Sequence, residues 1–177
     1  MPARHPNTNL ERFFSGVTEY TFEVKLGIVD PPLVDYLSAL LVHCVRTDQL
    51  HGFRTAGGHV VREFGRLIEE AETRIGAARR RVHRYIGDLA MFWTGVFPES
   101  LRQTEAKSDL DEFGTYCLVG KRAYLLASSI PPESEDAAAS DVLERLGLDF
   151  ERCAYGLREV RRQWEDDATD PGSSLMG

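Results

Sequence analysis

The segment from residue 79 to residue 97 carries the side chains best suited to chemistry. His83 titrates near neutral pH, and Asp88 supplies a carboxylate that can accept hydrogen bonds or hold a charge. Two glycines, Gly87 and Gly95, stand in the same segment. Because glycine weakens a helix, they indicate a close approach by backbone or by a ligand.

A candidate pocket follows from this segment, near residues 83–97 and 117–128. Trp93 is expected on its wall, and Lys121 and Tyr124 are expected to face it from the second stretch. Such a pocket predicts a small-molecule or cofactor binder, because a polar group buried in a helical bundle must be paired or functional. The competing interpretation is that the aromatic side chains of this segment only fill a core.

The densest group of potential metal ligands is His43, Cys44, Asp48 and His51. Zinc favours thiolate and imidazole donors, but the adjacent His43 and Cys44 point about 100° apart on a helix and cannot easily share one ion. The paired Glu-x-x-His motifs of a di-iron bundle are absent from the sequence. We therefore predict neither a metal site nor a resident cofactor.

Motifs for catalysis are also missing. A phosphate-binding loop needs four residues between its glycines and a Ser or Thr after its lysine, whereas five residues separate Gly114 from Gly120 and Arg122 follows Lys121. Cys117 shares a helical face with Lys121, which would favour its thiolate, but no third catalytic member is nearby. The sequence leans against an enzyme and assigns no catalytic residue.

Arg79, Arg80, Arg81 and Arg84 form the strongest local positive charge. This cluster is a candidate interaction surface for an anion or nucleic acid, but the net charge of −7 argues against nucleic acid. The acidic C-terminal helix or an acidic partner is the preferred target. The alternative is a solvated face paired with acidic neighbours, such as Asp88 four residues after Arg84. In either case, the like charges should lower the pKa of the histidine within the cluster.

Helices must position all of these side chains, because apolar residues recur at intervals of three and four along most of the chain. Thr8 and Glu11 have capping-box spacing, and Asp30-Pro31 is a second strong helix start. Residues 17–28 also alternate like a strand, but we favour a helix because no second strand is predicted to pair with it. The sum is an all-α bundle of five or six helices.

The longest periodic stretch runs from Val60 to Val96, with Gly76 near its middle. A glycine inside a helix costs about 1 kcal/mol relative to alanine. We predict one long central helix kinked near Gly76, and we keep a tight helical hairpin at that point as the alternative.

The last predicted helix bears a narrow apolar seam with spacings that alternate between three and four. The seam consists of Leu143, Leu146, Phe150, Cys153, Leu157, Val160 and Trp164. A seam of this kind packs within a bundle or coils with a partner, and Gly147 is a point where it could split. We take Leu157 and Trp164 as a candidate interaction surface. The leading functional expectation is therefore a non-enzymatic interaction or scaffold module that binds a second copy or another protein.

Length and composition set the outer limits. The 177 residues suit one helical domain over 9–166, between an N-terminal tail of residues 1–8 and a disordered C-terminal tail of residues 167–177. The longest apolar run is much shorter than the about 20 residues of a membrane span. Three cysteines without a CxxC pair, and a first segment without a signal-like apolar stretch, predict a cytoplasmic protein.

Overall fold

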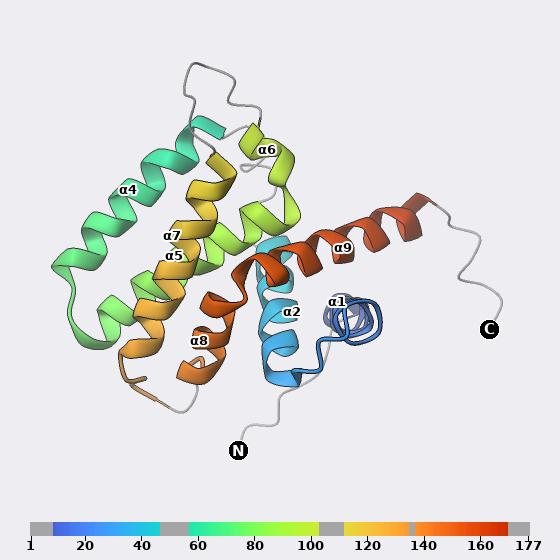
Figure 1. Ribbon diagram of the computed structural model, residues 1–177, viewed down its shortest axis with the longest axis horizontal. Coiled ribbons are helices and arrows are strands. Elements are labelled where there is room, and N and C mark those ends of the chain that lie inside the picture. Colours follow the sequence, from blue (N-terminus) through green and yellow to red (C-terminus); the bar gives the residue numbers. More distant parts are fainter. Residues whose placement is uncertain (1–8, 47–56, 103–111, 135–136, 170–177) are drawn as a thin grey trace.

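The structure, a computed structural model, describes residues 9–46, 57–102, 112–134 and 137–169. Every regular element in these ranges is helical, which confirms the all-α prediction (Figure 1). The elements are α1 (Asn9–Glu19), η1 (Tyr20–Lys25, a π-helix), α2 (Pro31–Arg46), α4 (Gly57–Thr73), α5 (Gly76–Val96), α6 (Pro98–Arg102), α7 (Glu112–Ser129), α8 (Ser140–Leu148) and α9 (Phe150–Thr169). The described ranges thus hold more helical segments than the five or six predicted.

The first helical unit confirms the helix favoured for residues 17–28, because α1 continues directly into η1 and ends at Lys25. Gly27 then adopts a φ of +67°, a left-handed conformation that suits glycine at a helix end. Asp30 caps the next helix, as its spacing predicted, by accepting a hydrogen bond from the Leu33 amide at 3.3 Å. The predicted capping residue Thr8 lies outside the described residues.

The prediction of one long, kinked central helix was wrong, and the alternative hairpin is what the structure shows. The first helix, α4, ends at Thr73, and the backbone is extended at Ile75. Gly76 has a φ of +54°, and α5 starts there and packs against α4 (Figure 1). The periodicity did not reveal the turn because both arms of the hairpin bury an apolar face, so the three-four spacing continues across it.

The apolar seam near the C-terminus is also divided between two helices. The break falls at Asp149, between α8 and α9, rather than at Gly147. A Cβ atom at Gly147 would lie 2.7 Å from a Leu125 side-chain carbon, so this glycine permits close packing on α7. The last helix continues to Thr169, three residues beyond the expected domain end at 166, and residues 170–177 lie outside the described part of the chain.

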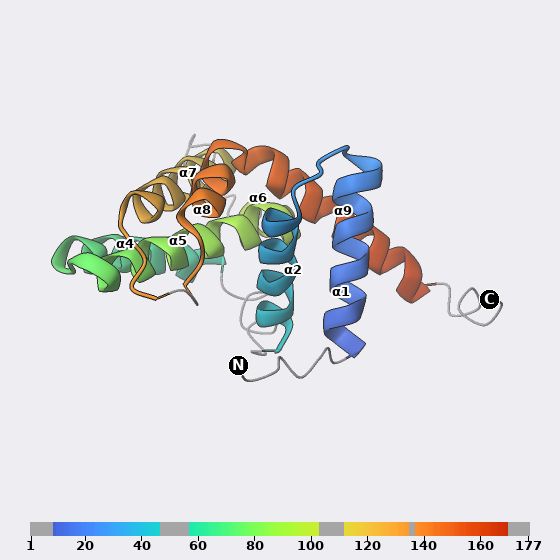
Figure 2. The same cartoon turned by 90° about the horizontal axis from the view of Figure 1, so that it is seen from below.

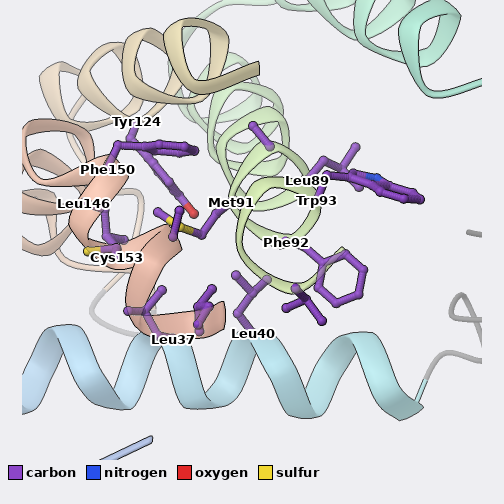
Figure 3. Packing of buried hydrophobic residues seen from close by; sticks show 14 of the residues in the cluster. Leu37, Leu40, Leu89, Met91, Phe92, Trp93, Tyr124, Leu146, Phe150 and Cys153 are labelled. Atoms are coloured by element: carbon purple, nitrogen blue, oxygen red, sulfur yellow. The ribbon is translucent and has the colours of Figure 1, made fainter. Parts of the chain in front are cut away.

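The helix α5 lies at the centre of the fold and contacts α2, α4, α6, α7 and α9. Figure 3 shows Leu37 and Leu40 of α2 lying toward Met91 and Phe92 of α5, while Trp93 leaves α5 in another direction. The first helix, α1, packs on both α2 and α9 (Figure 2).

The expected close approaches at glycine are confirmed by the packing of α5 against α7 and α9. A Cβ atom at Gly87 would lie 2.7 Å from ring carbons of Tyr124, and one at Gly95 would lie 2.8 Å from Leu157. Because real Cβ contacts are longer, these neighbours reach α5 only where a side chain is missing. In the described ranges, no helix combines the length and apolar character that crossing a bilayer requires.

Candidate functional site

A cavity of about 480 Å³ lies between α2 and α5. Its walls are mainly apolar, and three of its polar lining residues, Tyr36, Arg84 and Asp88, contact one another and are called the polar end below. The lining residues are Tyr36, Ala39, Leu40, His43, Cys44, Arg81, Arg84, Tyr85, Asp88, Leu89 and Phe92. This volume falls within the range of about 300–1,000 Å³ that is typical of small-molecule pockets.

The polar end of the cavity is a hydrogen-bonded network centred on Asp88. Tyr36 donates to Asp88 Oδ1 at 2.6 Å, and Tyr124 donates to the same oxygen at 2.8 Å. Arg84 donates from Nε to the Tyr36 hydroxyl at 2.9 Å, and the same Nε lies 3.8 Å from Asp88 Oδ2. This pairing of Arg84 with Asp88 confirms the expected contact between side chains four residues apart.

Local sequence explains how the network is assembled. Arg84 and Asp88 are one helical turn apart on α5, so their side chains share a face. The missing side chain of Gly87 lets the Tyr124 ring lie flat enough on α5 for its hydroxyl to reach the carboxylate. Tyr36 lies early in α2, whose capping residue Asp30 accepts two hydrogen bonds from Arg145 at 2.6 and 3.1 Å.

Burial governs the electrostatics of this network. It raises the pKa of Asp88, and the hydrogen bonds from Tyr36 and Tyr124 together with the charge of Arg84 lower that pKa without cancelling the effect. Burial and the nearby carboxylate raise the pKa of both tyrosines, which therefore stay protonated and donate. Burial also raises the pKa of Cys44 to about 12, so the cavity holds a thiol rather than a reactive thiolate.

The structure does not bring His83, Asp88 and Lys121 together, as the predicted pocket required. His83 is 7% exposed and accepts a hydrogen bond from Arg79 Nε at 3.4 Å, away from the cavity. Lys121 forms an ion pair with Glu151 at 2.9 Å. Of the predicted lining residues, only Asp88 and Tyr124 belong to one network, and the cavity opens toward α2 instead of α7.

Trp93 is part of the core rather than of the cavity wall. Its side chain is 1% exposed and makes edge-to-face contact with Phe92 at 6.2 Å between ring centroids. The pKa of His83 is lowered, as expected. Burial is the larger cause, and the charges of Arg79 and Arg122 come second.

The arginine cluster is occupied by partners inside the chain. Arg80 is 4% exposed and donates to the carbonyl oxygens of Ile130 and Ala138 at 2.9 and 2.6 Å, which fastens the connection from α7 to α8. Arg81 pairs with Glu133 of the same connection at 3.0 Å. These contacts account for two of the four arginines that sequence analysis offered as an interaction surface.

The seam offered as a second interaction surface lies inside the fold. Leu157 is fully buried and lies against Gly95 of α5, and Trp164 packs edge-to-face on Phe14 of α1 at 5.3 Å. The seam is therefore filled by α5 and α1 of the same chain.

Sequence reasoning missed Tyr36 altogether. Its place in the apolar repeat of α2 looks like that of any core residue, and only the tertiary contact with Asp88 reveals its role. His43 and Cys44, considered as metal ligands, both line the cavity, whereas Asp48 and His51 lie outside the described residues. Among the residues with described positions, no three His, Cys, Asp or Glu side chains are placed to share a metal ion.

Comparisons with known proteins found no match to this chain, whether among family models, curated proteins or solved structures.

Proposed function

We propose that this chain binds a small, mainly apolar molecule in the cavity between α2 and α5. The observation that carries the proposal is the meeting of apolar walls with a polar end in one hollow of about 480 Å³. Pockets for small molecules combine these features, since apolar walls supply affinity and a few fixed polar groups supply orientation.

The polar end is accessible from the cavity. The Asp88 side chain retains 17% exposure, and that of Arg84 retains 40%, although both lie at the contact of two helices. A partly buried ion pair adds little net stability, because the cost of desolvation offsets most of its electrostatic attraction. An opening beside apolar side chains such as Leu89 and Phe92 instead supports a role in binding.

Binding to a protein partner, the leading expectation from the sequence, has lost its main support. The apolar seam that motivated it is covered within the chain at Leu157. The small-molecule alternative is therefore preferred, with its pocket moved to the α2 side of α5.

Isothermal titration with octanol, a neutral apolar probe, tests the proposal. Ala39 is exposed and lines the cavity, so Ala39→Trp should fill the space without disturbing the core. We expect one octanol per wild-type chain and loss of binding in Ala39→Trp. Leu118→Trp is the matched control, because Leu118 is 69% exposed on α7 and outside the cavity. Absence of octanol binding to the wild type, or equal binding by both variants, would refute the proposal.

A further inference from the structure

Arg84 stands at the polar end of the cavity between α2 and α5, and we infer that it holds the carboxylate of an organic acid bound there. The inference rests on the proposed function and names its ligand class. Four features of the site carry it: the fixed orientation of the guanidinium, its uncommitted nitrogens, the balance of charge around the cavity and the apolar walls.

The orientation of Arg84 is fixed by a chain of hydrogen bonds. The Tyr36 hydroxyl donates a hydrogen bond to Asp88, and its oxygen accepts one from Arg84 Nε at 2.9 Å. The guanidinium also lies over the Tyr36 ring, at 5.4 Å from its centroid. Because ordering a long side chain costs entropy, an arginine already held in place binds its ligand more tightly than a mobile one.

The polar contacts described for this guanidinium all use its Nε atom. That nitrogen donates to Tyr36 and faces Asp88 Oδ2 at 3.8 Å, and within the described residues the two terminal nitrogens have no partner at hydrogen-bond distance. A planar fork of two N–H donors matches the two oxygens of a carboxylate. Arg84 is therefore ready for a bidentate contact.

The charge around the cavity favours an anion. Two arginines, Arg81 and Arg84, line it, against the single carboxylate of Asp88. Both oxygens of that carboxylate are already engaged, one by hydrogen bonds from two tyrosines and the other by Arg84, which leaves them poorly placed to bind a ligand cation. An ammonium group would meet the arginines, whereas a carboxylate would be attracted by them.

The apolar part of the ligand follows from the walls. Leu40, Leu89 and Phe92 are all buried to 8% exposure or less and border the hollow. The volume of about 480 Å³ lies within the range of about 300–1,000 Å³ found for small-molecule pockets. The ligand class is thus a monocarboxylic acid with a medium-length alkyl or aryl body.

Titration calorimetry with octanoate, octanol and octylammonium compares the affinities of three probes that share one alkyl chain and differ in the charge of the head group. We expect octanoate to bind wild-type protein roughly tenfold more tightly than octanol, the size of one hydrogen-bonded charge, and octylammonium to bind most weakly. Arg84→Gln should remove the advantage of octanoate and keep the octanol affinity. Arg162→Gln is the control, because Arg162 is 68% exposed, pairs with Glu159 and lies outside the cavity, and it should change octanoate affinity by no more than roughly twofold.

The outcomes distinguish the two proposals. Equal affinities for octanoate and octanol, unchanged in Arg84→Gln, would overturn the carboxylate inference and leave the proposed function standing. Failure of all three probes to bind wild-type protein would overturn both. If Arg84→Gln also failed to bind octanol, Arg84→Lys would be measured next, because lysine keeps the positive charge but lacks the two parallel N–H donors of the guanidinium. Selective loss of octanoate in that variant supports the inference, and equal loss of both probes overturns it.

Discussion

Tyr36 and Tyr124 donate hydrogen bonds to the same oxygen, Oδ1 of Asp88, at 2.6 and 2.8 Å. The two tyrosines come from α2 and α7, and their rings meet edge-to-face at 6.4 Å. One carboxylate on α5 thereby joins three helices at the polar end of the cavity. The same contacts that hold the fold together also fix the groups that would meet a ligand.

Removing one of these hydroxyl groups should destabilise the protein. Tyr124→Phe leaves the buried Asp88 with one donor fewer, which should lower the free energy of unfolding by about 1–3 kcal/mol. Tyr116→Phe is the matched control, because the Tyr116 hydroxyl is buried without a hydrogen-bond partner in the described structure. Urea unfolding of both variants should show a loss only for Tyr124→Phe. An equal loss would mean that the hydroxyl contact with Asp88 contributes nothing of its own.

The raised pKa of Asp88 predicts a dependence of stability on pH. The native state keeps the proton to a higher pH than the unfolded state, whose carboxyl has the ordinary value of 3.8, so stability falls as pH rises from that value through the raised one. The groups facing Asp88 are Tyr36, Tyr124, Arg84 and His43. Asp88→Asn removes only the titrating group.

The measurement for this prediction is the free energy of unfolding of wild type minus that of Asp88→Asn, followed from pH 3 upward in small steps (roughly one unit each). We expect the difference to decrease as pH rises from 3.8 through the raised pKa of Asp88, and then to level off. A difference that increases with pH would show that the native state favours the ionised carboxyl.

His83 should cause a loss of stability in mild acid. Burial first, and then the charges of Arg79 and Arg122, lower its pKa below the ordinary 6.5. The native state therefore binds its proton later than the unfolded state, and stability falls as pH drops from 6.5 through the lowered value. His83→Gln keeps an acceptor for Arg79 and should flatten this part of the thermal-stability profile. Parallel profiles for wild type and variant would contradict the prediction.

The close contact at Gly120 should make this glycine intolerant of substitution. A Cβ atom there would lie 2.4 Å from the Phe150 ring and 2.8 Å from Ala90, so Gly120→Ala should lower stability by about 1–3 kcal/mol despite better helix propensity. Gly65→Ala in α4 meets no neighbour within 4 Å and should raise stability by about 0.5–1 kcal/mol. Thermal unfolding that changed in the same direction for both variants would disprove the packing explanation.

Much of the fold could be predicted from local signals. Apolar spacing and caps such as Asp30 indicate helices because they report which face is buried and where a backbone hydrogen-bond ladder begins. The reversal at Gly76 could not be distinguished from a kink, since the spacing of apolar residues continues across it. The break at Asp149 was hidden in the same way, because both of its flanking helices bury the same seam.

The site was only partly accessible from the sequence. Asp88 and Tyr124 were chosen for their types and position, and the glycine beside Asp88 correctly indicated a close approach. His83 and Lys121 were assigned to the same pocket because helical spacing alone does not show which neighbour each face of α5 meets. Tyr36 lies 52 residues from Asp88 along the chain, and nothing local in α2 predicts their contact.

The most direct test of the account is a measurement of nuclear Overhauser effects between bound octanoate and isotope-labelled protein. We expect contacts from the octanoate chain to the side chains of Leu40, Leu89 and Phe92, which border the cavity. These contacts should disappear in Ala39→Trp. Contacts confined to exposed residues such as Leu118 and Leu148, or their persistence when the cavity is filled, would contradict the claim that the hollow between α2 and α5 is the binding site.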